Sequence, residues 1–305
     1  MIGYNEYQNI IPLPRRRAYF VFGDDTEMVD KFVLEGLNVK FDIQYFVGGM
    51  FPRAHFAICN LNGEHLQYLT SLFSFGNPMR RNRTIKFFAG YDDAKPPGAL
   101  ANITLLYKGV VMLTSITPPP DIWFNIEALA CGNIRGSRVQ FFLKGAKTIR
   151  EIAAMAASYY GLELEWRAMN PGAKIIQDFA CDGDGFALAD KLSRADLDIQ
   201  FCSDSLRLRV TDTKAPVDNP AVPHWLIDRD HAMIGVPRFS YNGATVDTLL
   251  NPLARAGDCA ILKSKFQTLG NSALVGSYFI RQLRHHGELR GNDFNTTFDL
   301  FRPKV

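Results

Sequence analysis

Short runs in which apolar residues recur at every second position fill two long stretches of the sequence, about 18–145 and 230–305. Arg53–Cys59 is a clear example, and residues 60–63 close it with Asn and Gly, which favour turns. Neighbouring side chains of a strand point to opposite faces of a sheet, so a period of two predicts strands buried on one face. Many short strands separated by turns are typical of a β-barrel or a β-sandwich.

Between these stretches the period changes to that of a helix. Thr148 is followed three residues later by Glu151, a capping box that satisfies two backbone amides at a helix start. Apolar residues then recur at helical spacing, and Gly161 stands where the helix would end. The spacing therefore predicts a helix from Thr148 to Gly161.

The rest of this middle segment predicts one more helix and a hairpin. A helix is expected over residues 185–194, where Phe186 and Leu192 share a face. Alternating residues on both sides of 203–205 then predict a β-hairpin.

Composition agrees with a β-rich protein that makes large contacts. Of the 305 residues, 47% are hydrophobic and 21% are charged, which is ordinary for a globular chain. The 23 Phe and 11 Tyr favour pleated, half-buried surfaces and protein interfaces.

The net charge of +3 and a pI near 8.5 are too mild for a typical nucleic-acid binder. They argue against one alternative, an oligonucleotide-binding β-barrel. The basic residues Arg15, Arg16 and Arg17, and the cluster at 80–83, are interpreted as a solvated loop or an interface patch. The role of Arg15–Arg17 is left open.

The five cysteines are scattered, and none forms a C-x-x-C pair. They are expected to be free thiols in a protein assembled in a reducing cytoplasm. The first 14 residues lack the apolar core of a signal peptide, and no apolar run approaches the ~18 residues of a membrane span. A soluble protein with no membrane partner is expected.

Candidate chemical motifs are weak. Residues 182–185 alternate Asp and Gly, but an EF-hand needs a late bidentate Glu, and Ser193 occupies that position; Asp184 is expected to cap a helix instead. His285 and His286 are adjacent, so on a strand they point to opposite faces and cannot share a ligand set. There is no nucleophile elbow and no phosphate-binding glycine loop. No catalytic, cofactor-binding or metal-binding residue is therefore assigned.

The C-terminal stretch carries a resemblance to a known family. Its order of segments, 243–252, 255–258, 276–280, 286–294 and 296–300, resembles the end of contractile phage tail baseplate hub proteins of the late control protein D type. The positions that carry the motif are Leu250, Asn251, Pro252, Gly257, Asp258, His286, Gly287, Gly291 and Phe294. In physical terms, Pro252 can close an edge strand, Gly257 and Asp258 turn the chain, and Gly287 and Gly291 bracket a hairpin loop. Phe294 stands where the family commonly has tryptophan, and Glu288 where it has aspartate.

The resemblance implies a structural virion protein and no enzyme: a homotrimeric hub that adapts the six-fold tail tube to the three-fold central spike. It implies the tube and spike proteins as partners, with tape measure and baseplate wedge proteins as further candidates. It also implies a channel that lets DNA pass without sequence-specific binding, and a place in the tail baseplate after assembly in the host cytoplasm. The alternative from another class is a tail-associated hydrolase of cell wall or capsule.

The expected fold is α+β and mainly β, with two β-barrel domains related by pseudo-symmetry flanking a small α/β domain. The expected divisions are an N-terminal arm (1–17), a first β-barrel (18–145), the α/β domain (146–213), a proline-containing linker (214–229) and a second β-barrel (230–305).

Overall fold

The computed structural model describes residues 15–24, 27–48, 51–73, 83–92, 103–130, 139–183, 190–192, 194–197, 199–203, 206–212, 220–229, 231–240, 243–263 and 275–302. The elements of the first strand region are β1 (Arg15–Asp24), β2 (Glu27–Glu35), β3 (Val39–Phe46), β4 (Arg53–Cys59), α1 (Gly63–Phe73), β5 (Arg83–Asp92), β6 (Thr104–Ile116) and β7 (Trp123–Leu129). Those of the α/β unit are β8 (Val139–Thr148), α2 (Ile149–Tyr160), β9 (Glu163–Trp166), β10 (Ile175–Gly183), β11 (Ile199–Ser203) and β12 (Arg207–Asp212). Those of the C-terminal strand region are β13 (His224–Ile227), β14 (Met233–Ser240), β15 (Gly243–Leu249), β16 (Cys259–Leu262), β17 (Gly276–Glu288) and β18 (Phe294–Phe301).

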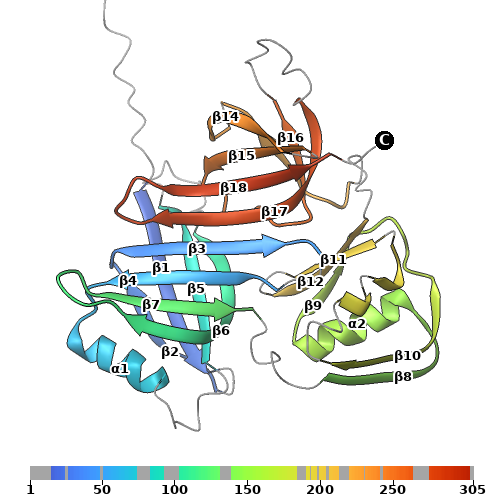
Figure 1. The fold of residues 1–305 in the computed structure, drawn as a ribbon, viewed down its shortest axis with the longest axis horizontal. Coiled ribbons are helices and arrows are strands. Elements are labelled where there is room, and N and C mark those ends of the chain that lie inside the picture. Colours follow the sequence, from blue (N-terminus) through green and yellow to red (C-terminus); the bar gives the residue numbers. More distant parts are fainter. Residues whose placement is uncertain are drawn as a thin grey trace, which may run out of the picture.

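The two strand regions form one continuous sheet. Its strands lie in the order β14-β15-β18-β17-β3-β4-β7-β6-β5-β1-β2, and β13 and β16 branch from β17. The connection is the antiparallel pair of β3 and β17, in which Gly287 lies opposite Phe41 and His286 opposite Asp42 (Figure 1). Strands more than 230 residues apart in the sequence are therefore neighbours, and this seam joins the regions edge to edge.

The core of this sheet is aromatic and continuous across the seam. In the first region the rings of Phe20, Phe56 and Phe87 lie 4.8–5.2 Å apart. Across the seam, the rings of Phe41 and Phe294 meet edge to face at 5.5 Å. Each fully buried Phe contributes roughly 1.5–3 kcal/mol, so the two regions stabilise each other.

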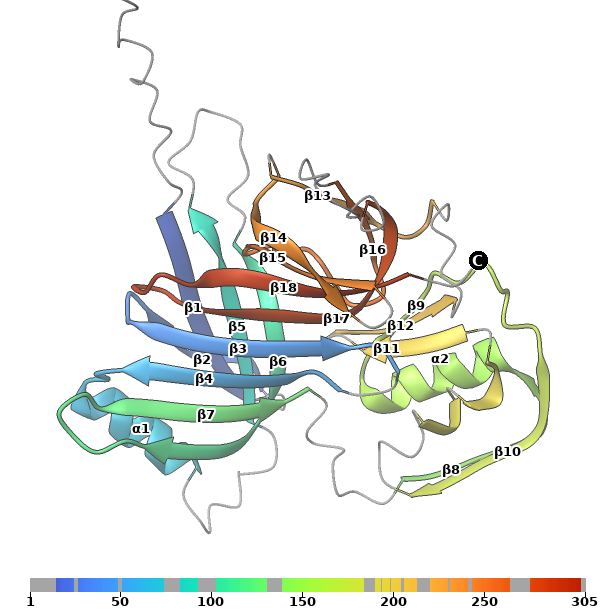
Figure 2. The same ribbon diagram turned by 45° about the horizontal axis from the view of Figure 1, so that its top comes forward.

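The α/β unit has a smaller core of its own, built around α2. The capping box at Thr148 is present, and Gly161 ends the helix in the left-handed conformation, as the sequence predicts. The predicted hairpin is also confirmed, since β11 pairs antiparallel with β12. Figure 2 shows α2 between that sheet and the two-stranded ribbon of β8 and β10.

The predicted second helix lies mostly outside the described residues. Residues 190–192 and 194–195 are helical, and Leu192 is buried. Asp184, the expected cap, is not among the described residues. The first strand region also contains one short helix, α1, with Leu69 buried.

The mainly β, α+β class is confirmed, with two differences in detail. Within the described part of the chain, strand pairing closes neither strand region into a barrel. Pro252 does not close an edge strand, because β15 lies between β14 and β18 and the sheet edge is β14. The sequence cannot distinguish an edge strand from its inner neighbour, since apolar and polar residues alternate in the same way in both.

Two elements bear on the predicted domain divisions. β8 spans the predicted boundary at residue 145 and pairs with β10 of the α/β unit. β13 lies inside the predicted linker and pairs in parallel with β16.

Among the residues that the structure describes, no helix has the length and apolar character needed to cross a bilayer. The described cysteines Cys59, Cys181, Cys202 and Cys259 are free thiols, and Cys131 lies outside the described residues.

Candidate functional site: the motif positions and the contacts between regions

The segment from Leu250 to Pro252 is a corner that fastens β15 to the rest of the sheet. The amide of Leu250 donates to the carbonyl of Phe294 at 2.9 Å and to the Tyr91 hydroxyl at 3.1 Å. The amide of Asn251 donates to the Thr296 hydroxyl, while its side-chain oxygen accepts from the next turn. Because Tyr91 belongs to β5, this corner ties the C-terminal region to the first region.

Gly257 and Asp258 form the next turn, which faces the α/β unit. Gly257 has φ of +92°, and a Cβ there would lie 3.1 Å from the Cys202 sulfur, so glycine suits both the turn and the close approach. Asp258 is buried. Its carboxylate accepts from the indole of Trp225 at 2.9 Å and from the amide of Arg255 at 2.9 Å.

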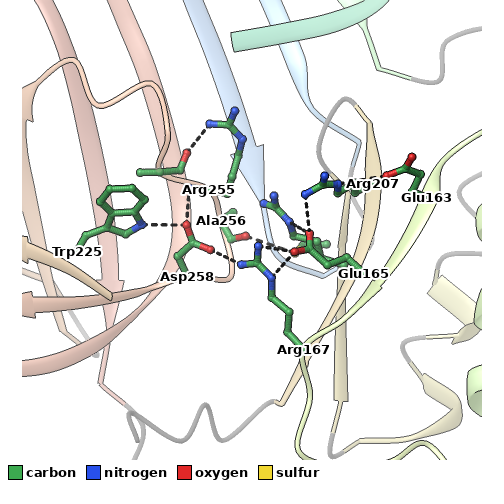
Figure 3. Close-up of polar contacts among 11 residues, drawn as sticks. Glu163, Glu165, Arg167, Arg207, Trp225, Arg255, Ala256 and Asp258 are labelled. Atoms are coloured by element: carbon green, nitrogen blue, oxygen red, sulfur yellow. Dashed lines mark hydrogen bonds and ion pairs between the residues drawn. The ribbon is translucent and has the colours of Figure 1, made fainter. Parts of the chain in front are cut away.

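The same carboxylate begins a chain of charges that crosses to the α/β unit (Figure 3). Arg167 Nη1 lies 2.7 Å from Asp258 Oδ1, and Arg167 also pairs with Glu165 at 2.6 Å. Glu165 in turn accepts from Arg209 at 2.7 Å and lies 3.6 Å from Arg207. We call these five residues the ionic joint.

Electrostatics favour the ionised form of Glu165 in the joint. Burial alone would raise the pKa of Glu165, but hydrogen bonds from Arg209 and Arg167 and their positive charges lower it. Buried charges are tolerated only when they are paired and hydrogen-bonded, so Arg167, Arg209 and the two carboxylates require one another. The joint therefore holds the α/β unit in one orientation on the strand sheet.

His285 and His286 point to opposite faces of β17, as predicted. His285 is fully buried, and its Nδ1 lies 2.9 Å from the Thr296 hydroxyl. Burial, with smaller contributions from Arg255 and His286, holds the pKa of His285 well below its ordinary value. His286 is half-buried on the outer face, where its Nε2 lies 3.0 Å from the Thr297 hydroxyl.

Gly287, Gly291 and Phe294 shape the hairpin between β17 and β18. A Cβ on Gly287 would lie 2.6 Å from the carbonyl oxygen of Asp293, so no larger residue fits without moving the backbone. Phe294 is buried between the rings of Phe41 and Tyr91, at 5.5 and 5.4 Å.

Arg16 secures this hairpin from the first region. It lies on β1 and donates to the carbonyls of Gly291 at 2.6 Å and Asn292 at 2.9 Å. Its guanidinium carbon lies 5.3 Å from the centre of the Phe294 ring. Of the two interpretations of the basic cluster, the solvated loop is wrong at this position, because β1 begins at Arg15 and Arg16 binds the hairpin, while the interface patch stays a prediction.

Most of the motif positions thus lie at contacts between regions, and these contacts position backbone rather than reacting groups. Among the described residues, no group of three or more His, Cys, Asp and Glu side chains is arranged to hold a metal ion. Sequence reasoning missed Arg167 and Glu165, which no local pattern distinguishes. It noticed Arg16 only as part of a basic cluster.

The whole fold is similar to that of solved tail proteins. The 43 kDa tail protein of prophage MuSo2 from Shewanella oneidensis matches with a TM-score of 0.61 at 9% identity, over 93% of this chain and 96% of that chain. The E. coli c3393 protein, a type VI secretion component described as similar to phage T4 tail proteins gp27 and gp5, matches with a TM-score of 0.57 at 10% identity, over 93% and 77%. A tail protein from Neisseria meningitidis MC58 gives 0.54 at 9% identity, over 93% and 96%. At these identities the likeness concerns the fold, and the comparison with curated protein sequences gives no match.

The fold is similar to that of solved phage and prophage tail proteins. The chain belongs to the baseplate hub gp41 family, whose model matches residues 19–300. The resemblance to baseplate hub proteins seen in the sequence is thereby confirmed, and the family is one of structural tail proteins located in the virion tail.

Proposed function

We propose that this chain is a homotrimeric hub of a contractile tail baseplate, which adapts the six-fold tail tube to the three-fold central spike. The observation that carries the proposal is the seam between β3 and β17. It makes the two strand regions one rigid body. A trimer of such bodies presents six strand regions around an axis, which suits a six-fold ring on one side and a three-fold spike on the other.

The proposal keeps the division into an N-terminal arm, two strand domains related by pseudo-symmetry, an α/β domain and a linker. The α/β unit lies at one end of the strand sheet in Figures 1 and 2, where the Gly48 amide bonds to the Phe201 carbonyl. A unit in this position is free to contact the spike or neighbouring baseplate proteins. Assembly takes place in the host cytoplasm, with tube and spike proteins as the principal partners.

Native mass spectrometry tests the trimer directly. The chain has a mass of 34.3 kDa, so the trimer is expected at about 103 kDa. The measurement is repeated after co-expression with tube and spike proteins. A chain that stays monomeric or dimeric in both settings overturns the proposal.

Electron microscopy of the co-expressed complex tests the adaptor geometry. The expected map shows three hub chains whose two strand regions alternate around one channel, with a six-fold tube ring on one side and a three-fold spike on the other. Strand regions that stack along the axis instead of alternating would contradict the adaptor mechanism.

A further inference from the structure

A pocket opens where the C-terminal strands meet the end of β5. Its volume is about 290 Å³. We call it the corner pocket, and its lining includes Tyr91, Trp225, Ile227, Leu249, Leu253 and Phe298. Phe298 is buried, whereas Leu249 is 40% exposed and Leu253 is 51% exposed. The pocket therefore leads from the surface to the core of the sheet.

The size and lining of the corner pocket suit one or two aliphatic side chains. Pockets for small molecules usually measure roughly 300–1,000 Å³ and have polar groups that converge on the ligand. Here the polar groups of the two aromatic residues are already used within the chain. The Tyr91 hydroxyl accepts from the amide of Leu250 at 3.1 Å, and the Trp225 indole donates to Asp258 at 2.9 Å. What the pocket offers to an occupant is mainly apolar contact.

The chain itself carries a short apolar segment next to this pocket. Residues 10–14, which we call the arm segment, read Ile-Ile-Pro-Leu-Pro and directly precede β1. They lie outside the described residues. Residues 1–9 contain Asn, Glu and Gln, so the apolar part of the N-terminus is the part nearest to the sheet. Five successive residues without a polar side chain gain from being covered by an apolar surface.

The start of β1 brings the arm segment within reach of the corner pocket. In the pairing of β1 with β5, Arg16 lies opposite Tyr91, which lines the pocket (Figure 2). An extended residue advances about 3.3 Å, so Leu13 and Ile11 reach about 10 and 17 Å from Arg16. Residues two apart point to the same side of an extended backbone, and the prolines at 12 and 14 disfavour a helix. Ile11 and Leu13 can therefore enter the pocket together.

We propose that the arm segment folds back and docks in the corner pocket of its own chain, with Ile11 and Leu13 inserted. A tethered segment this short has a high effective concentration at its own site, which favours the same chain over another copy. The docked segment connects β1 of the first region to β13 and β15 of the C-terminal region, and it covers Leu249 and Leu253. It is thus a second fastening between the strand regions, besides the seam. The inference concerns one chain and does not depend on the proposed hub function.

Disulfide trapping in the full-length chain tests the docking. Ile11→Cys combined with Leu253→Cys is expected to form a disulfide within one chain under mild oxidation. Adding Leu13→Asp to this pair removes one of the two docked side chains and should slow the trapping about 10-fold. This control keeps the arm equally close to the pocket, so it separates docking from proximity. Peptide mapping identifies the joined residues, because the chain has five cysteines of its own.

Proteolysis gives a second measurement that needs no new cysteine. Thermolysin cleaves before large apolar residues, and mass spectrometry follows its cut between residues 9 and 10. Leu253→Asp, at an exposed position, should release the arm segment and speed this cut about 10-fold. Phe142→Asp is the control, because Phe142 is 64% exposed on β8 of the α/β unit. Circular dichroism verifies that each variant is folded.

The outcomes separate the possible occupants of the pocket. A disulfide within the chain that Leu13→Asp slows, together with faster cleavage in Leu253→Asp alone, supports the proposal. A disulfide between two chains would mean that the arm segment docks on another copy, which overturns docking within the chain. Equal trapping with and without Leu13→Asp, or equal cleavage in all folded variants, would show that the arm segment does not occupy the pocket. None of these results bears on whether the chain forms a trimer.

Discussion

The seam between the strand regions and the ionic joint to the α/β unit are built from different interactions. At the seam, backbone bonds between β3 and β17 continue the sheet, and Phe41, Phe294 and Tyr91 share one core. At the joint, Asp258, Arg167, Glu165 and the arginines of β12 connect the C-terminal strands to the α/β unit, whose apolar core also takes in Phe51 and Leu129 of the first region.

The seam makes the two strand regions rigid relative to each other, whereas the ionic joint sets the orientation of the α/β unit. A continuous sheet with a common apolar core unfolds as a unit, since its contacts do not depend on one pair of groups. A buried ion pair adds little net stability but loses several kcal/mol when one partner is removed. We therefore expect the two strand regions to act as one body, and the α/β unit to keep its orientation as long as the joint is intact.

The largest effect is expected at the seam. Phe294→Ala removes a fully buried ring and leaves a cavity beside Phe41 and Tyr91. The free energy of unfolding should fall by about 3–5 kcal/mol, as for other buried Phe to Ala changes. Urea denaturation monitored by circular dichroism measures it.

Phe142→Ala is the matched control, because Phe142 is 64% exposed on β8 and its loss should change stability by less than about 0.5 kcal/mol. Hydrogen exchange should show faster opening on both sides of the seam in Phe294→Ala. Protection lost only in the C-terminal strands would mean that the regions do not form one body.

A somewhat smaller effect is expected at the ionic joint. Asp258→Asn removes the charge that compensates Arg167, and the free energy of unfolding should fall by about 3 kcal/mol. Asp299→Asn breaks the exposed pair with Arg281 and should cost less than about 1 kcal/mol. Small-angle scattering should show a changed position of the α/β unit in Asp258→Asn alone. Equal, small losses in both variants would show that the joint does not hold the α/β unit.

The sequence predicts those features that depend on neighbouring residues. Helix α2 could be predicted because Thr148, Glu151 and Gly161 specify its ends locally, and the β11–β12 hairpin because its turn lies between two alternating runs. The seam could not be predicted from the sequence. The pairing of β3 with β17 depends on tertiary packing, and the alternation of apolar residues in the two strands fits several partners and registers equally well.

The contacts of the motif positions could likewise be predicted only where they are local in sequence. Motif reasoning found Asp258 as part of a turn, but its partner Arg167 lies 91 residues away in a segment without any pattern. Gly291 could be assigned to a hairpin, yet the hydrogen bond that its carbonyl accepts from Arg16 of β1 needs the folded sheet. Side chains that bridge distant segments carry no local signal.

Acidification should weaken the seam by an intermediate amount. Burial holds the pKa of His285 well below the ordinary 6.5, so this histidine stays neutral in the folded protein. Burial and Arg284 also lower the pKa of His286. Below pH 6.5 the unfolded chain therefore binds more protons than the folded one, and stability falls as pH falls. Buried His285 should contribute up to about 1.4 kcal/mol per pH unit below 6.5, and half-exposed His286 less, because solvent screens its interactions.

Unfolding free energies of the wild type and His285→Gln, measured between pH 7.5 and 5, test this effect. His285→Gln should flatten the pH dependence by the share of one histidine, although its stability at pH 7.5 will be lower. His65→Gln on α1 controls for the loss of a histidine as such. An unchanged slope in His285→Gln would show that His285 is not held neutral in the folded state.

The smallest effect on stability is expected from a change inside the α/β unit. Hydrogen exchange of such a variant shows whether the core around α2 opens separately from the core of the strand sheet. Thr148→Ala removes the hydroxyl that accepts the Glu151 amide at 3.2 Å and should destabilise α2 by about 1 kcal/mol. Thr148→Ser keeps the hydroxyl and is the control. Because α2 packs in the smaller core, hydrogen exchange should quicken in α2, β8 and β10 while the strand sheet keeps its protection. Equal loss of protection in β3 and β17 would mean that the ionic joint couples the cores as tightly as the seam couples the strand regions.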